Sequence, residues 1–194
     1  MKILLQLARA IDALNERVGH SIYWLILIMV MISTVNALFR KLFNMSSNAF
    51  LEIQWYLFAA VFLLGSGYTL LRNEHVRIDV LSGKLGARAQ IWIDILGTLL
   101  FLFPFTLLIL YDGWHYFVLS FTGWEWSLNP GGLLVWPAKL LIPVGFLLLF
   151  LQGLAQLIKL IGALQGHGDS SDLLAHHTEE EDIVETLLGK PDNK

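Results

Sequence analysis

Cysteine is absent from the 194 residues of this chain. Without thiols there are no disulfide bonds, no cysteine nucleophile and no cysteine-ligated metal site. Charge is scarce as well, because Asp, Glu, Lys and Arg make up 15% of the residues, against about a quarter in an average soluble domain. The formal net charge of −3 supplies no basic field for nucleic acid. These deficits favour a chain that lies largely in lipid.

The small-residue cleavage motif of a secretory signal peptide is also missing. The first apolar run begins near Ser21 and is about as long as a bilayer core is thick, so we interpret it as a retained span. The sequence contains no nucleophile–base pair, metal cluster or phosphate-binding loop. We therefore expect neither enzymatic activity nor a bound cofactor or metal.

Four long apolar runs are present instead, at residues 21–39, 50–71, 91–111 and 133–161. A helix needs about 20 residues to cross the hydrocarbon core, so each run predicts a transmembrane helix. Residues 1–19 carry apolar side chains at helical spacing, which indicates an amphipathic helix at the membrane interface, or else a helix that packs on a partner or caps the first span. The expected fold is an all-α membrane protein, with a transmembrane domain over residues 20–165 and a hydrophilic acidic tail over residues 166–194.

Lysine and arginine are distributed unevenly between the two sides that four spans define. One side carries eight of them: Lys2, Arg9, Arg17, Arg72, Arg77, Lys84, Arg88 and Lys159. The other side carries three: Arg40, Lys41 and Lys139. Because cytoplasmic segments are enriched in Lys and Arg, both termini are predicted to be cytoplasmic. The aromatic loop at 112–132 then lies outside, with a turn predicted at Asn129-Pro130-Gly131-Gly132.

Three ionisable residues fall inside the predicted spans, all near span ends: Glu52, Asp94 and Lys139. Glu52 shares the outer depth with Arg40 and Lys139, whereas Asp94 lies at the inner depth beside two arginines. Opposite charges in a low dielectric attract strongly, so we predict that Glu52 pairs with these cations or contacts a partner. The alternative is that Glu52 snorkels to water.

The middle of each span is apolar or small, which bears on transport. A proton- or ion-coupled carrier usually places carboxylates at the midplane beside broken helices, and Pro104 alone predicts only a kink. Gly65, Ser66 and Gly67 let helices approach closely. Polar side chains able to bond between helices are Ser33, Thr34, Asn36, Gln152 and Gln156. The chain is therefore predicted not to carry a solute by itself.

Three stretches carry a family resemblance. They read EIQWYLF at 52–58 running into GSGY at 65–68, then EHVRIDV at 74–80, and finally NPGGL at 129–133, WPAK at 136–139 and IPVG at 142–145 with Gln152. Over about residues 11–159 the chain resembles the small membrane subunit, DctQ-like, of tripartite ATP-independent periplasmic (TRAP) transporters. The third stretch resembles a branch associated with uptake of oxo-acids and related carboxylates.

The resemblance implies a non-catalytic scaffold subunit in a sodium-driven, secondary active uptake system of the bacterial inner membrane. It implies as partners a large multi-span membrane subunit of the elevator type, a periplasmic solute-binding protein that meets the assembled complex, and membrane phospholipids. The residues expected in partner or structural contacts are Glu52, Trp55, Gly65, Gly67, His75, Arg77, Asp79, Trp136, Pro137, Lys139 and Pro143. Those expected at lipid headgroups are Arg72, Arg77 and Arg88.

Two other functions stay open at this point. A four-helix bundle can hold haem between two histidines or bind a quinone, but His20 and His75 lie at the inner boundary and His115 at the outer one. A small multidrug exporter acting as a dimer needs a membrane-embedded carboxylate, and Glu52 is too near the surface. A visible spectrum would reveal haem, and drug binding by the chain alone would support the exporter.

Overall fold

Nearly all of the chain that the computed structural model describes is helical, and the described residues are 2–44, 47–72 and 87–165. The helices are α1 (Lys2–Phe43), α2 (Asn48–Leu71), α4 (Ala87–Gly97), the π-helical segment η1 (Thr98–Leu102), α5 (Phe103–Thr122) and α6 (Trp136–Leu164). In these ranges no strand forms, and a single bridge joins Trp126 to Leu134. The expected all-α fold is confirmed.

Within the described ranges, four helical stretches are long and apolar enough to cross a membrane: α1, α2, residues 90–122 and α6. This confirms the four predicted spans, although their bounds differ: α6 begins at Trp136 rather than at residue 133, and the other helices extend past the apolar runs. The third continues from the predicted end at residue 111 to Thr122, because helical backbone bonding does not require apolar side chains.

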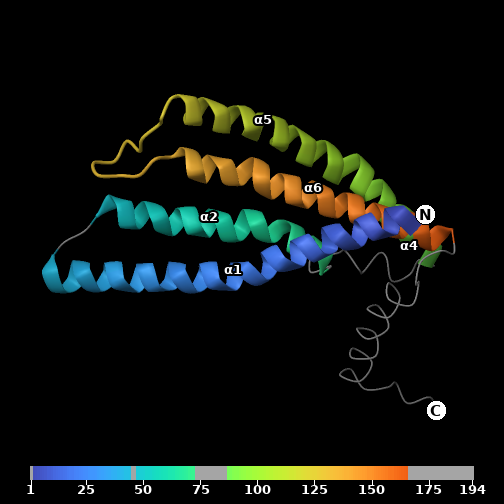
Figure 1. Ribbon diagram of the computed structural model, residues 1–194, viewed down its shortest axis with the longest axis horizontal. Helices are drawn as coiled ribbons and strands as arrows, with labels where there is room; N and C mark the ends of the chain where they lie inside the picture. Colours follow the sequence, from blue (N-terminus) through green and yellow to red (C-terminus); the bar gives the residue numbers. More distant parts are fainter. Residues whose placement is uncertain (1, 45–46, 73–86, 166–194) are drawn as a thin grey trace, which may run out of the picture.

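Residues 1–19 and the first span were predicted as separate elements, and the structure joins them in the single helix α1. Gly19 lies at the junction under the ring of Tyr68, where a Cβ atom would come within 2.3 Å of a ring carbon. The close approach therefore requires glycine. Figure 1 shows the N-terminal part of α1 leaning across the molecule toward the C-terminal half of α6.

The helices lie side by side in the order α1, α2, α6, α5 (Figure 1). Helix α6 touches α1, α2 and α5, and it also meets α4 and η1. We call the end where α1 finishes, α2 begins and residues 123–135 lie the loop end. The opposite end, where α1 and α4 begin and α6 finishes, is the N-terminal end.

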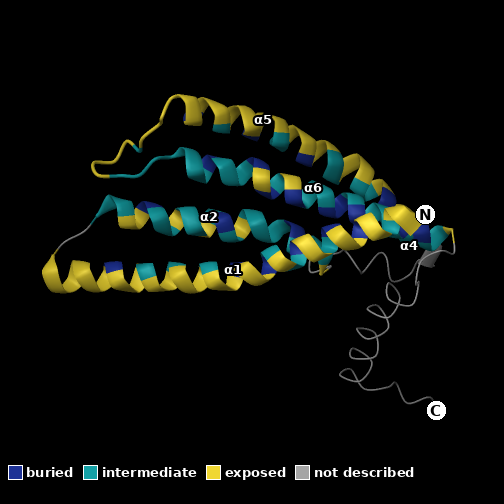
Figure 2. Cartoon of the chain, viewed as in Figure 1, coloured by how far each residue is buried: buried dark blue, intermediate teal, exposed yellow. Residues whose placement is uncertain are grey.

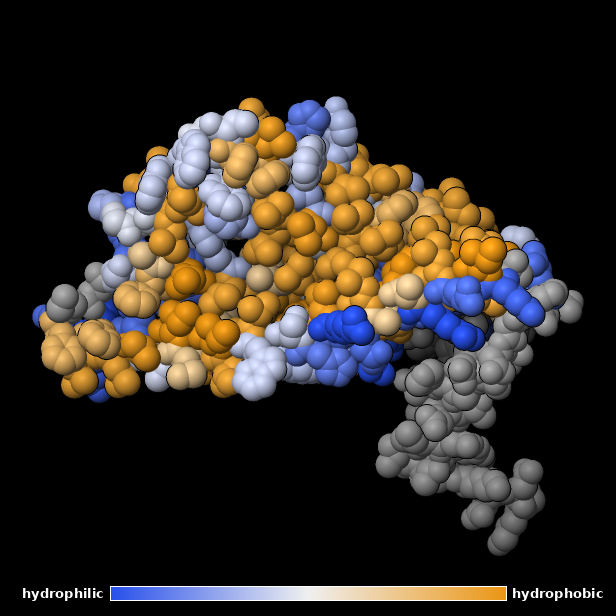
Figure 3. All heavy atoms as spheres, viewed as in Figure 1, coloured by the Kyte–Doolittle hydropathy of each residue, from blue (hydrophilic) through white to orange (hydrophobic). Residues whose placement is uncertain are grey.

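The layer buries little of its apolar surface. Only 11% of the most apolar window is buried in α1, in α2 and in residues 90–122, against 33% in α6. Figure 2 shows this as exposed colour along α1 and α5, and Figure 3 shows apolar residues over most of one face. The helices therefore present most of their apolar side chains to lipid or to another protein.

The π-helical segment η1 precedes Pro104, which stands in the first turn of α5. Proline has no backbone N–H and its ring collides with the carbonyl of residue i−4, so an uninterrupted α-helix is strained there. A wider turn relieves that collision, and π-turns are a recognised cause of helix irregularity. The predicted kink thus takes the form of a π-turn in a continuous helix.

Candidate functional site

A short hairpin over residues 125–135 connects α5 to α6. Its two arms are joined by backbone hydrogen bonds from Ser127 N–H to the Leu133 oxygen at 2.9 Å and from Val135 N–H to the Glu125 oxygen at 3.0 Å. The tip is a turn closed by Gly132 N–H on the Asn129 oxygen at 3.0 Å, with Gly131 at φ 72°. Proline before a glycine of positive φ is the pattern of a type II turn. The predicted turn is confirmed.

Glu52 of α2 is inserted into this hairpin and is 2% exposed. Its carboxylate accepts bonds from the Ser127 hydroxyl, from Asn129 Nδ2 at 3.0 Å and from Leu133 N–H at 2.6 Å. Gly132 leaves room for it, because a Cβ atom there would lie 2.7 Å from Glu52 Oε1. Three donors to one buried carboxylate hold the hairpin on the start of α2.

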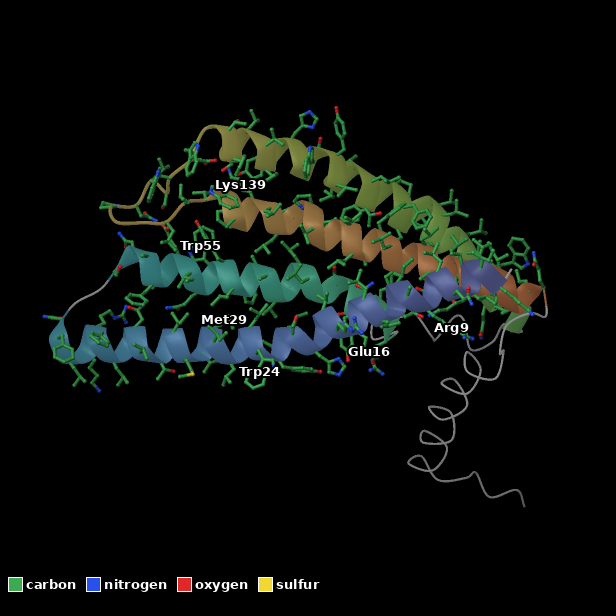
Figure 4. The ribbon with its side chains drawn as sticks, in the orientation of Figure 1. Arg9, Glu16, Trp24, Met29, Trp55 and Lys139 are labelled. Atoms are coloured by element: carbon green, nitrogen blue, oxygen red, sulfur yellow. The ribbon has the colours of Figure 1, made fainter. Side chains whose placement is uncertain are left out.

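A second contact ties the hairpin to α6. Lys139 is 8% exposed, donates to the Glu125 carboxylate, and lies 3.9 Å from the ring centre of Tyr116 on α5. Figure 4 shows Lys139 at the beginning of α6. The Lys139 ammonium holds the pKa of Glu125 below its ordinary value. Ion pairing and a ring face together compensate the buried lysine charge.

The prediction that Glu52 pairs with Lys139 or Arg40 is therefore wrong. In the described residues its partners are all neutral donors of the hairpin, and Lys139 pairs with Glu125. Similar depth did not decide the pairing, because the hairpin lies between the two side chains and offers each of them a nearer group. Snorkelling is wrong as well, since the carboxylate is buried.

A second polar cluster joins the N-terminal part of α1 to α6 and α2. Asn15 Nδ2 donates to Gln152 Oε1 at 2.8 Å, and Gln152 Nε2 donates to Asp12 at 2.9 Å. Asp12 also pairs with Lys159 at 2.5 Å. Farther along, Glu16 pairs with Arg72 at 2.7 Å, and both are partly exposed. The prediction that Gln152 bonds between helices is confirmed.

The predicted small residues lie at helix contacts. Gly65 lies against Ile22, and Gly67 lies against Asn15 and the Leu148 carbonyl. Pro143 is buried beside Gly113.

The predicted aromatic positions are more exposed. Trp136 and Pro137 begin α6. The ring centres of Trp136 and Phe121 lie 5.4 Å apart. Trp55 is 56% exposed and borders a shallow groove between α1 and α2. The groove is lined by Met29, Val30, Ser33, Thr34, Gln54, Trp55 and Phe58. In Figure 4, Met29 and Trp55 mark the two helices that form it.

Several predicted residues lie outside the described part of the chain. They are His75, Arg77 and Asp79, as well as the tail over residues 166–194. Arg88 belongs to α4, but its side chain is not described.

The sequence analysis identified Glu52, Lys139 and Gln152 but not the residues that bond to them. The sequence analysis did not single out Glu125, Ser127, Asp12 or Glu16. Their signal in the sequence is opposite charge near matching span ends, where Asp12 meets Lys159 and Glu16 meets Arg72. That signal is ambiguous until the helix order is known.

No group of three or more metal-binding side chains occurs in the ranges that the structure describes. The two described histidines lie on different helices with different neighbours: His20 accompanies Tyr23 and Tyr68, and His115 accompanies Tyr111. Nothing in this geometry favours a haem site.

Membrane-length helices and sparse burial of apolar side chains define an integral membrane protein built as a layer of helices. A sequence model of the family described as tripartite ATP-independent periplasmic transporters, DctQ component, matches residues 29–163. The chain belongs to this family and is therefore a component of a TRAP transporter. Comparison with curated proteins and with solved structures found no match.

Proposed function

We propose that the chain is the small, non-catalytic scaffold subunit of a sodium-driven TRAP uptake transporter for carboxylate-type solutes. It supports a large elevator-type membrane subunit, and a periplasmic solute-binding protein feeds the assembled complex. The observation that carries this proposal is the family match over residues 29–163 in a chain that exposes most of its apolar surface.

The exposed apolar surface of the helices favours a scaffold role over independent transport. The charged residues described in α2 and α6 are all engaged within the chain: Glu52 anchors a hairpin, Lys139 pairs with Glu125, and Lys159 pairs with Asp12. A carrier that binds an anionic solute alone needs free polar groups at the midplane. A broad apolar face, by contrast, suits lateral packing against a larger membrane subunit.

We further propose that the protein lies in the bacterial inner membrane with both termini in the cytoplasm. Eight of the eleven lysines and arginines outside the tail belong to the predicted cytoplasmic side. The hairpin at the loop end is then periplasmic, on the side from which the binding protein approaches. Arg72, Arg77 and Arg88 are then placed to meet phospholipid headgroups.

The named residues divide into supporting roles under this proposal. Gly65, Gly67 and Pro143 permit close helix packing, and Glu52 and Lys139 fix the hairpin that Trp136 and Pro137 follow. Trp55 contacts lipid or the large subunit. His75, Arg77 and Asp79 hold the cytoplasmic connection after α2.

Co-purification and reconstitution test the proposal. The tagged chain, expressed with the large membrane subunit and the binding protein of one TRAP system, is expected to pull down the large subunit. Vesicles that hold both membrane subunits are expected to take up solute when sodium and the binding protein are present. Sodium-dependent uptake into vesicles that contain this chain alone would refute the supporting role, and so would full uptake without it.

A further inference from the structure

Contacts between neighbouring helices set a common height across the layer. Gly65 lies against Ile22, Gly145 against Leu63, and Gly113 against Ile142. Counting along the helices from these contacts places Ile26, Phe62, Val144 and Tyr111 at one height, one residue on each of α1, α2, α6 and α5.

The nearest charged residue toward the loop end lies at a different distance from this height on each helix. Arg40 is 14 residues beyond Ile26, Glu52 is 10 beyond Phe62, and Lys139 is 5 beyond Val144. Asp112 directly follows Tyr111. At 1.5 Å per residue, the charged boundary descends by about 20 Å from α1 to α5.

The opposite boundary descends in the same direction. Toward the N-terminal end, Arg17 lies 9 residues from the common height on α1 and Arg72 lies 10 residues from it on α2. Lys159 lies 15 residues away on α6, and Asp94 of α4 lies 17 residues from Tyr111 along the continuous span of residues 90–122. Every helix thus has a stretch of about 18–23 residues between its charged ends, or about 30 Å, which matches a bilayer core.

A bilayer perpendicular to the helices does not fit these boundaries. The heights that are free of charge on all four helices together run only from the level of Arg17 to that of Asp112. They span about 15 Å, half of a hydrocarbon core. Asp112 is exposed on the outside of α5, so this chain does not shelter it. An exposed carboxylate deep in lipid is strongly disfavoured.

We propose that the bilayer crosses this layer obliquely, with all four helices tilted in the plane of the layer. From α1 to α5 the loop-end boundary shifts by about 20 Å and the N-terminal boundary by about 12 Å, so the mean shift is about 16 Å. Over three helix spacings of about 9 Å, this shift corresponds to a tilt of about 30°. Transmembrane helices tilt by about 20° on average. The apolar surface between the two charged boundaries contacts the hydrocarbon core of the lipid bilayer.

The N-terminal part of α1 agrees with this oblique edge. It leaves α1's place in the layer and crosses toward α6, where Ala8 packs against Ala155 (Figure 1). It therefore follows the same direction as the descending boundary and runs along the membrane surface. Ile3 is 80% exposed, and Leu7 and Leu14 are half exposed on the same side of the helix. A hydrophilic band follows this part of α1 in Figure 3. This is the geometry of an interfacial helix.

Because the chain contains no cysteine, a single introduced cysteine can carry one spin label, and the depth of that label in the bilayer tests the tilt. Single variants Phe62→Cys and Tyr111→Cys place a spin label at two exposed positions of equal height, 70% and 67% exposed. In nanodiscs of the full chain, we expect the label at 111 to be severalfold more accessible to a water-soluble nickel chelate. The label at 62 should be relaxed mainly by oxygen, because it lies near the bilayer centre.

A second pair of variants at the N-terminal end, with the opposite expected order of depths, controls for local effects of the label. Phe101→Cys in η1 and Arg72→Cys at the C-terminal end of α2 also share one height, and here the position in η1 should be the deep one. Elution as a single species identifies folded variants. Equal depths within either folded pair, or a reversed order, would overturn the oblique bilayer.

Discussion

At the scale of single residues, Glu52 has a role that its charge alone does not reveal. Its carboxylate receives two side-chain donors and one backbone N–H from the same hairpin. An ionised carboxylate acts only as an acceptor, so it matches three donors without conflict. Gly132 completes the site, since any larger residue would collide with Glu52 and Ser127.

Glu52→Gln is therefore expected to loosen the hairpin. The new amide group brings a donor toward Leu133 N–H or toward the Ser127 and Asn129 donors, so at least one bond is lost. We expect faster amide exchange at residues 125–135 and severalfold lower recovery of the complex. Glu16→Gln makes the same chemical change at the N-terminal end, away from the hairpin, and serves as the matched control. Unchanged exchange in Glu52→Gln would show that the bonds contribute nothing.

The pairing of Lys139 is tested by exchanging charges. Lys139→Glu combined with Glu125→Lys should recover much of the stability that either single change removes, because the two groups are bonded. The same exchange between Lys139 and Glu52 should recover nothing. Thermal unfolding in detergent measures both cycles. Recovery in the second cycle would contradict the observed partners.

Acid should weaken the same contact in a defined range. Folding lowers the pKa of Glu125 from an ordinary value of 4.5. A lowered pKa stabilises the fold fully above the unfolded value, and this contribution disappears as pH falls through the folded value. The melting-temperature difference between wild type and Glu125→Gln should thus be constant from pH 7 to about 5 and shrink below 4.5. A difference that persists undiminished below that range would exclude this linkage.

At the scale of elements, the N-terminal part of α1 belongs to the helical layer. Ala8 and Ile11 pack against Ala155, and Asn15 is fully buried on Gln152. A purely interfacial helix would have only lipid on its apolar side. Here one side meets α6, and a neighbouring apolar side remains exposed.

Asn15→Ala should destabilise the protein by about 1–3 kcal/mol, because it leaves the buried Gln152 oxygen without its donor. Gln6→Ala changes an exposed residue of the same helix and should have little effect. Denaturant titration in mixed micelles compares the two. If the variants are equally stable, the contact between α1 and α6 is not formed in the folded protein.

At the scale of the whole molecule, the layer arrangement leaves each helix partly uncovered. Among the described helices, α6 contacts the three long helices α1, α2 and α5, and its apolar window has the largest buried share. Burial within the chain is small, so lipid and partner contacts must supply much of the stability of the assembled state.

Topology follows at this scale from the uneven distribution of lysine and arginine. Reporters fused after Lys159 should be active only if they work in the cytoplasm, whereas reporters inserted at residue 128 in the hairpin should be active only in the periplasm. Leu128 is fully exposed, so a reporter inserted there is accessible; because the insertion separates Ser127 from Asn129, it reads the side of the membrane and not the stability of the hairpin. The reverse pattern would reject the proposed orientation.

The sequence alone was sufficient for the features that depend on neighbouring residues. The four apolar runs, the Asn129–Gly132 turn and the effect of Pro104 were predictable because hydropathy and backbone restriction act locally. The family motifs were readable for the same reason. Helix ends were less predictable, since α5 continues to Thr122 through a mixed polar and aromatic segment.

Only the tertiary structure decided which groups meet. Depth along a span gives Glu52 and Lys139 the same level, yet a hairpin between them supplies Ser127, Asn129 and Glu125 as nearer partners. The order α1, α2, α6, α5 and the crossing of α1 onto α6 likewise depend on side-chain fit, such as Gly145 against Leu63. Such contacts join residues far apart in the chain, whose distances no local pattern specifies, whereas membrane insertion is set by the composition of each segment.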